Sequence, residues 1–156
     1  TDSGKMGMVL LMVIGGSPGS TAGGMKTTTA AVLFAMAISV FRKNEQAHLY
    51  NRRIAEETQR NAATIFVLYM MLFTGSAMFI SYLEKVPLVT AFFETGSAIG
   101  TVGLSLGLTP TLGLASRLVL ICLMFFGRVG GLTLIFATVS GKRTEYKYPQ
   151  EKINVG

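Results

Sequence analysis

The chain has 156 residues, of which 50% are hydrophobic and only 14% charged, and its formal net charge is +6. This composition excludes a disordered chain and a coiled coil, and the single cysteine excludes a domain held by disulfides. That cysteine, Cys122, stands in an apolar run and is expected to be buried. On so apolar a chain, a basic balance indicates cytoplasmic loops of a membrane protein and not a nucleic-acid partner.

Long stretches with few charges predict an all-α integral membrane protein, because a spanning helix needs about 20 apolar residues. Residues 61–83 carry no charge, and residues 118–141 carry only Arg128. Two further apolar stretches, residues 6–41 and 87–112, are each interrupted or dense in glycine. We therefore expect membrane helices that do not all cross the bilayer in one uninterrupted piece.

The first interruption is GGSPGSTAGGMKTTT, residues 15–29. It is not a phosphate-binding P-loop, because Met25 separates Gly24 from Lys26 where Walker A needs Gly-Lys adjoining. Small residues four apart also fit close helix packing, but Pro18 and the paired glycines disfavour a continuous helix. The sequence predicts a broken helix, residues 5–14 and 27–41, joined by an irregular loop. Lys26 would repel cations if it reached a cavity, and would be innocuous if it extended to the interface.

Basic residues are concentrated in two segments, 42–60 and 142–156, which together hold nine of the fourteen. The positive-inside rule places both segments on the cytoplasmic side, and His48 in the first is expected to be solvated. Residues 61–83 then cross outward and residues 118–141 cross back. Residues 87–112 must begin and end on the outer side, so they are predicted to be re-entrant.

The expected re-entrant segment has the order of a potassium-channel pore loop. Pro87 suits the start of a short helix over residues 88–99, whose C-terminal end carries partial negative charge. A filter over residues 100–104 follows, in which backbone carbonyls could replace the hydration shell of a potassium ion. The alternative is that the glycines only permit a tight turn. The candidate filter residues are Gly100, Thr101, Val102 and Gly103.

Two charged residues lie inside the apolar stretches. Glu94 is expected to be a buried hydrogen-bond partner that anchors the short helix, with ion binding as the alternative. Arg128, in FFGRVGG, would cost about 2.5–3.5 kcal/mol at mid-membrane and needs a partner or water. It is either part of a structural ion pair or carbonyl cluster, or an electrostatic barrier or latch that bonds to carbonyls of the loop at 15–26.

Four motifs in order, GGSPGSTAGGMKTTT, FETGSAIGTVGLSLGLTP, FFGRVGGLTL and YPQEKINVG, resemble the membrane subunit of Ktr-type potassium uptake systems, within the Trk/Ktr/HKT superfamily. The resemblance implies four helix–pore-loop–helix repeats around a pore. This chain is similar to the last repeat and the second helix of the third. With no signal peptide in its opening TDSGKMG, it is expected to be the C-terminal portion of a longer protein.

The resemblance also implies roles and partners. Gly103 is the filter glycine, Arg128 projects to the pore, and Met25 replaces an expected Ile. A homodimer, a cytosolic nucleotide-binding ring subunit of RCK/KTN type and membrane lipid are the implied partners, with no nucleotide on this chain itself. Sodium dependence is common in the family, but no residue here indicates it. The gating loop would comprise Gly15, Gly16, Ser17, Pro18, Gly19, Ser20, Thr21, Ala22, Gly23, Gly24 and Lys26.

The predicted organisation is a broken helix with its gating loop (1–41), a cytoplasmic basic loop (42–60), a helix–pore-loop–helix repeat (61–141) and a cytoplasmic tail (142–156). The predicted function is gated, regulated potassium transport across the cell membrane by a multi-pass protein. A non-conducting membrane scaffold with glycine-packed helices is the alternative. An enzyme is disfavoured, because the chain has one histidine and no carboxylate pair within a span.

Overall fold

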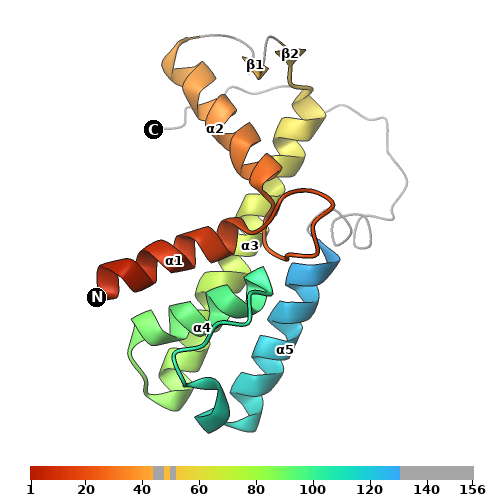
Figure 1. Ribbon diagram of the computed structural model, residues 1–156. Coiled ribbons are helices and arrows are strands. Elements are labelled where there is room, and N and C mark those ends of the chain that lie inside the picture. The colour runs from red at the N-terminus through yellow and green to blue at the C-terminus, as the bar shows by residue number, and fades with distance from the viewer. Residues whose placement is uncertain (44–47, 50–51, 131–156) are drawn as a thin grey trace, which may run out of the picture.

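The computed structural model describes residues 1–43, 48–49 and 52–130. This part of the chain is helical, as expected, apart from one short antiparallel pair of two-residue strands (Figure 1). The tail 142–156 and the second half of the last predicted span lie outside the described residues. The elements are α1 (Asp2–Ile14), α2 (Thr27–Phe41), β1 (His48–Leu49), β2 (Arg52–Arg53), α3 (Glu56–Glu84), α4 (Leu88–Gly100), a 3-10 turn (Thr109–Thr111) and α5 (Leu114–Val129).

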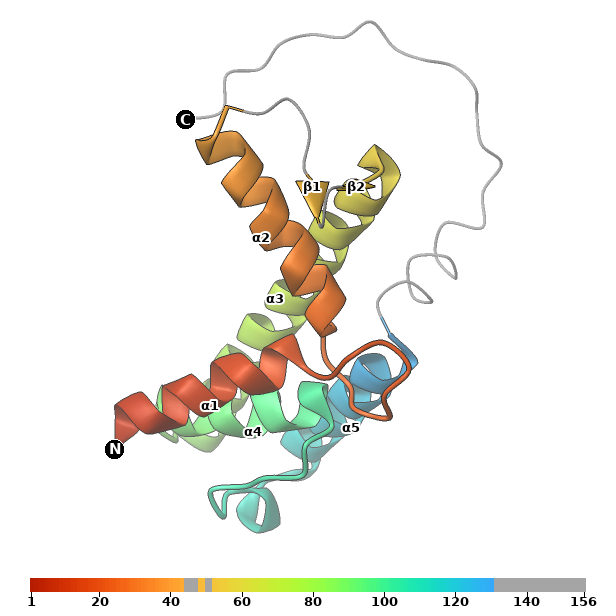
Figure 2. The same ribbon diagram turned by 45° about the horizontal axis from the view of Figure 1, so that its top comes forward.

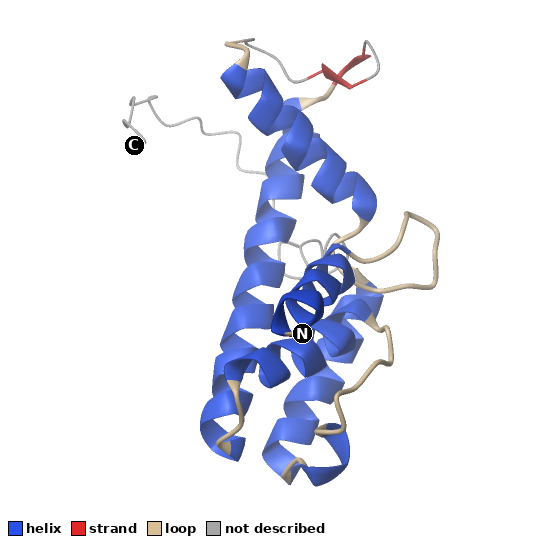
Figure 3. Cartoon of the chain, turned by 60° about the vertical axis from the view of Figure 1, so that its left-hand side comes forward, coloured by secondary structure: helices blue, strands red, loops and turns tan. Residues whose placement is uncertain are grey.

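The long helix α3 is the axis on which the other helices are arranged (Figures 1 and 3). Helix α2 packs along the N-terminal part of α3, whereas α4 and α5 pack along its C-terminal part. Helix α1 lies on α4, as Figure 2 shows from a second direction. The short helix α4 is therefore in contact with α1, α3 and α5 together.

The chain leaves α3, runs up α4 and returns to the same end of α3 before α5 begins. Lys85 adopts a left-handed conformation, and Pro87, which disfavours helix before it, starts α4. The carboxylate of Glu84 accepts hydrogen bonds from the amide of Gly113 at 2.9 Å and from the hydroxyl of Ser116 at 2.6 Å. The end of α3 thus holds the start of α5, and the excursion between them is closed at its base.

The predicted helices are present with small shifts of their ends. The broken helix has its second half at Thr27–Phe41 as predicted, and its first half begins at Asp2 instead of residue 5. The short helix extends one residue further, to Gly100. Helix α3 begins at Glu56, so the end of the predicted loop 42–60 is helical, with acidic residues in the first turn that favour a helix N-terminus.

One described helix, α3, is long and apolar enough to cross a membrane, and α2 is a shorter apolar helix. Helix α5 begins at Leu114, four residues before the predicted start of its span. Cys122 is exposed, contrary to the expectation that it is buried. The reason is that α5 turns Leu120 and Leu123 toward its neighbours and presents Ile121 and Cys122 outward.

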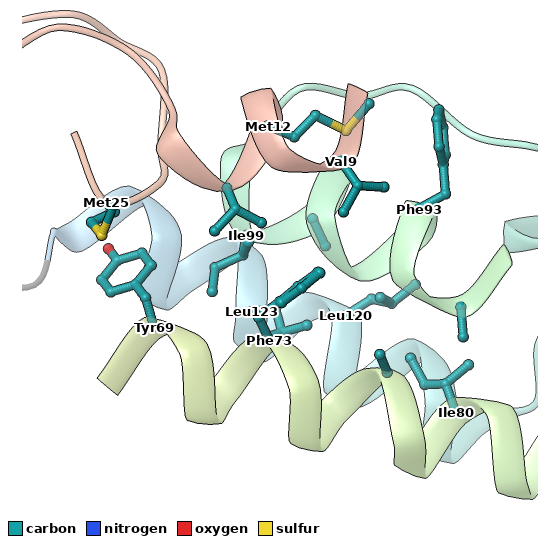
Figure 4. Close-up of a cluster of buried hydrophobic side chains, with 14 of the residues drawn as sticks. Val9, Met12, Met25, Tyr69, Phe73, Ile80, Phe93, Ile99, Leu120 and Leu123 are labelled. Carbon is teal, nitrogen blue, oxygen red and sulfur yellow. The ribbon is translucent and has the colours of Figure 1, made fainter. Parts of the chain in front are cut away.

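The buried cluster joins α1, α3, α4 and α5, and α2 packs partly buried side chains against it (Figure 4). Small residues at the contacts, Ala77 on α3 and Ala91 on α4, are fully buried and let the backbones approach closely, as is typical of membrane helices. Tyr69 of α3 is 1% exposed, and its hydroxyl donates to the carbonyl of Phe126 on α5 at 3.3 Å. Its ring lies beside Met25, which comes from the loop between α1 and α2 (Figure 4).

The closest helix contact generates a prediction about stability. Gly127 of α5 is buried against the last turn of α4, and a Cβ added there would overlap the carbonyl of Ile99. We expect Gly127→Ala to destabilise the full-length protein by about 1–3 kcal/mol through overpacking.

Thermal unfolding of the detergent-solubilised protein measures this effect. The control is Gly75→Ala on α3, where an added Cβ meets nothing within 4 Å and the helix gains about 1 kcal/mol in propensity. Equal melting temperatures for the two variants would contradict the close contact at Gly127.

Candidate functional site

The predicted filter begins where α4 ends in a tight reversal. Thr101 adopts a left-handed conformation with φ of 52°, which is uncommon for a residue with a side chain. The amide of Thr101 donates to the carbonyl of Ala98 at 3.1 Å, and that of Val102 donates to the carbonyl of Ser97 at 2.9 Å. Both amides therefore point back to α4, and the segment that follows, residues 102–105, is neither helix nor strand.

The carbonyl oxygens of this reversal differ in whether they accept hydrogen bonds. Within residues 1–43, 48–49 and 52–130, no hydrogen bond reaches the carbonyl oxygens of Thr101, Val102 or Gly103. The carbonyl of Gly100, in contrast, accepts a hydrogen bond from the amide of Gly23 at 3.1 Å. Three of the four candidate residues thus have carbonyls available to a ligand, while the first is engaged by the loop between α1 and α2.

That loop, residues 15–26, is called the glycine-rich loop below, and it is attached to the end of α4 by main-chain hydrogen bonds. The amide of Gly23 also donates to the hydroxyl of Thr101 at 2.7 Å, and the amide of Gly24 donates to the carbonyl of Ile99 at 3.0 Å. The last carbonyls of a helix lack partners within it, so these donors satisfy groups that would otherwise be unpaired.

The same loop is closed at its base by bonds between its two sides. The amide of Met25 donates to the carbonyl of Val13 at 3.2 Å, and that of Thr27 donates to the carbonyl of Gly16 at 3.1 Å. In Figure 1 the loop lies beside the C-terminal ends of α4 and α5. Its tip, residues 17–21, is exposed, whereas Gly23, Gly24 and Met25 are buried.

Both cations predicted near this loop bond to its carbonyls. The guanidinium of Arg128, one residue before the end of α5, donates to the carbonyl of Thr21. The ammonium of Lys26 turns back to the carbonyl of Ala22 at 2.5 Å. In the described part of the chain, neither cation forms an ion pair with a carboxylate. The structure therefore brings Arg128 and the loop together, while the roles of both stay predictions.

Glu94 is a buried hydrogen-bond partner, as the sequence suggested, and the residue as a whole is only 3% exposed. Its carboxylate accepts from the hydroxyl of Ser105 at 2.7 Å, the amide of Leu106 at 2.8 Å and the hydroxyl of Thr109 at 2.6 Å. The sequence did not identify these donors, because the pattern LSLGLTP contains no signal that ties them to α4.

A hollow of about 750 Å³ runs along this side of the molecule. Its lining includes Glu94, Thr101, Gly103 and Arg128. Among the described residues, no group of three or more His, Cys, Asp or Glu side chains could hold a metal ion.

Comparisons with known proteins agree with the sequence motifs. The family described as TrkH, cation transport protein, matches residues 1–146. The Potassium/sodium uptake protein NtpJ of Enterococcus hirae is 41% identical over 155 residues, which cover 95% of this chain and 34% of that protein. The Ktr system potassium uptake protein B of Bacillus subtilis is 33% identical over 148 residues, covering 95% and 33%. The chain thus spans about a third of the length of these relatives.

The bond between the glycine-rich loop and Thr101 generates a second prediction. Thr101→Val keeps the shape of the side chain but removes the hydroxyl that accepts from Gly23. Losing one such bond should weaken the attachment by about 1 kcal/mol, which makes transient detachment of the loop roughly fivefold more frequent.

The measurement is the rate at which a thiol reagent modifies Ser20→Cys in the loop, in a full-length background carrying Cys122→Ser. Thr101→Ser is the matched control, because it keeps the hydroxyl and should modify at the parental rate. A Thr101→Val rate equal to that of Thr101→Ser would show that this bond does not hold the loop.

Proposed function

The chain belongs to the TrkH family of cation transport proteins, and from this we propose that it forms part of a gated pathway for potassium ions across the cell membrane. The observation that carries the proposal is the run of carbonyls at Thr101, Val102 and Gly103 that no donor among the described residues reaches, directly after a short helix that ends inside the helix cluster. Cation transport places the chain in a membrane, and the family is one of transporters and not of enzymes in the usual sense.

The chemistry of selection would be that of backbone carbonyls. A ring of carbonyl oxygens can replace the hydration shell of a potassium ion. One such segment cannot surround an ion, so the pathway requires further pore loops from other segments of a longer chain or from other subunits. The excursion from α3 through α4 and back to α5 supports this role, because it begins and ends at Glu84.

We assign the glycine-rich loop to the gate and the present arrangement to a closed state. Two features support this: the loop bonds to the end of α4 just before the candidate filter, and the guanidinium of Arg128 on α5 donates to a carbonyl at the tip of the loop. The charge of Arg128 would oppose a cation that leaves the filter, while its bond to Thr21 would hold the loop in place. Opening requires that these bonds break together.

We further propose that the complete protein is a multi-pass homodimer controlled by a cytosolic nucleotide-binding ring subunit. The support is the name of the Ktr system relatives, which implies a system of several components. The basic segments 42–60 and 142–156 would face that subunit from the cytoplasmic side. Sodium dependence is part of the proposal because the relative NtpJ is named a potassium/sodium uptake protein.

The competing proposal is a non-conducting scaffold, favoured by the tight packing of Gly127 against Ile99. The two proposals differ in what happens when the filter is altered. Gly103 has φ of 82°, which side chains rarely adopt, so any substitution there introduces backbone strain as well as altering the filter. A strain-matched control is therefore needed.

Gly130 at the end of α5 supplies that control, because it has φ of 85° and, like Gly103, nothing within 4 Å of an added Cβ, and it lies outside the candidate filter and the segment that follows it. We expect Gly103→Ser to lower potassium affinity and the preference for potassium over sodium in the full-length protein, whereas Gly130→Ser keeps the preference. Potassium and sodium uptake in proteoliposomes measure both quantities. Unchanged uptake in Gly103→Ser would favour the scaffold.

Deleting residues 17–24 tests the gate. The deletion removes the amides of Gly23 and Gly24 and the carbonyl that Arg128 binds, so the loop can no longer attach to α4. Potassium flux without the regulatory subunit should rise severalfold over the wild-type protein measured in the same way. A flux that stays at the wild-type level would remove the gating role.

A further inference from the structure

Glu94 holds the chain segment that follows the candidate filter. It lies near the middle of α4, and its side chain is directed to the returning segment and not to the helix cluster of α1 and α3. All three of its donors come from one stretch of five residues, 105–109. A single buried carboxylate therefore gathers the returning segment onto α4.

The same stretch is tied within itself. The hydroxyl of Ser105 accepts from the amide of Gly107 at 2.9 Å and lies 3.3 Å from the hydroxyl of Thr109. One carboxylate oxygen of Glu94 accepts from Ser105 and Leu106, and the other accepts from Thr109. The stretch is thus a compact unit with Glu94 at its centre.

The candidate filter carbonyls lie between two attachments to the same helix. Before them, the amides of Thr101 and Val102 bond to carbonyls of α4. After them, the first residue of the stretch held by Glu94, Ser105, comes two residues beyond Gly103. Between these attachments, residues 103 and 104 form no hydrogen bond among the described residues. The two attachments therefore set where the carbonyls of residues 101–103 lie.

We propose that Glu94 is a positioning residue that fixes the spacing of the carbonyls at 101–103 and thereby sets the preference for potassium over sodium. This inference rests on the proposed function. Discrimination between the two ions depends on the geometry or the number of coordinating carbonyl dipoles, and both change if the returning segment moves. Glu94 acts through its hydrogen bonds and does not touch the ion.

Two substitutions separate hydrogen bonding from charge. Glu94→Gln keeps the shape and can keep all three bonds, because its oxygen accepts from Ser105 and Leu106 while its amide donates to the hydroxyl of Thr109. Glu94→Leu has a similar volume and keeps none. If Glu94 positions the filter, we expect the potassium preference of the full-length protein to fall about tenfold in Glu94→Leu and to stay within about twofold in Glu94→Gln.

The measurement is the ratio of potassium to sodium uptake in proteoliposomes, with thermal unfolding as the check on folding. Equal loss in both variants would mean that the carboxylate acts by its charge as an ion ligand, and this overturns the inference. An unchanged ratio in Glu94→Leu overturns it as well. Wild-type protein that carries no potassium would instead refute the proposed function itself.

Thr109 provides a second route if Glu94→Leu does not fold. This residue is exposed, so Thr109→Val should fold, yet it removes the donor to one carboxylate oxygen of Glu94. We expect a smaller fall in the uptake ratio for Thr109→Val and none for the matched control Thr109→Ser, which keeps the hydroxyl. Equal ratios for these two variants would overturn the inference.

Discussion

The structure depends on how the open end of one short helix is satisfied. A helix that stops inside a non-aqueous interior leaves carbonyl groups that must find donors, because unpaired backbone groups are costly there. Helix α4 finds part of these donors in its own reversal and the rest in the amides of Gly23 and Gly24. The bond from Gly23 to Thr101 joins residues 78 positions apart. The glycines permit the break between α1 and α2, and α4 requires it, because the loop at the break supplies these amides.

Other parts of the molecule are arranged around this junction. Gly127 lets α5 pass against the last turn of α4, and this brings Arg128 within reach of the exposed tip of the glycine-rich loop. The hydroxyl of Tyr69 on α3 donates to the carbonyl of Phe126 on α5, one residue before Gly127. The ring of Tyr69 lies in the same buried cluster as Met25. A movement of the loop would therefore disturb contacts made by α3, α4 and α5.

The sequence predicted the helices and their breaks because these are local matters of apolar length, glycine and proline. It also predicted that Glu94 bonds within the protein, and it gave a bond from Arg128 to the loop as one of two alternatives, since a charge among apolar residues needs a partner. It could not supply the particular donors to Glu94, or the pairing of Gly23 with Thr101, because these depend on how distant segments meet. The outward position of Cys122 was missed for a related reason, since an apolar run does not reveal which of its faces is covered. The roles of the filter and gate residues stay predictions.

The main-chain character of the loop's attachment has a consequence for sequence variation. Gly23, Gly24 and Met25 hold α4 and α1 through N–H groups, which every residue except proline possesses. The exposed tip at 17–21 contributes a carbonyl to Arg128, and carbonyls are common to all residues. Apart from Gly19, at φ of 82°, and Ser20, whose hydroxyl accepts from the amide of Ala22, tip side chains can diverge without loss of the junction, so the ease of opening can change there while the architecture at α4 stays constant.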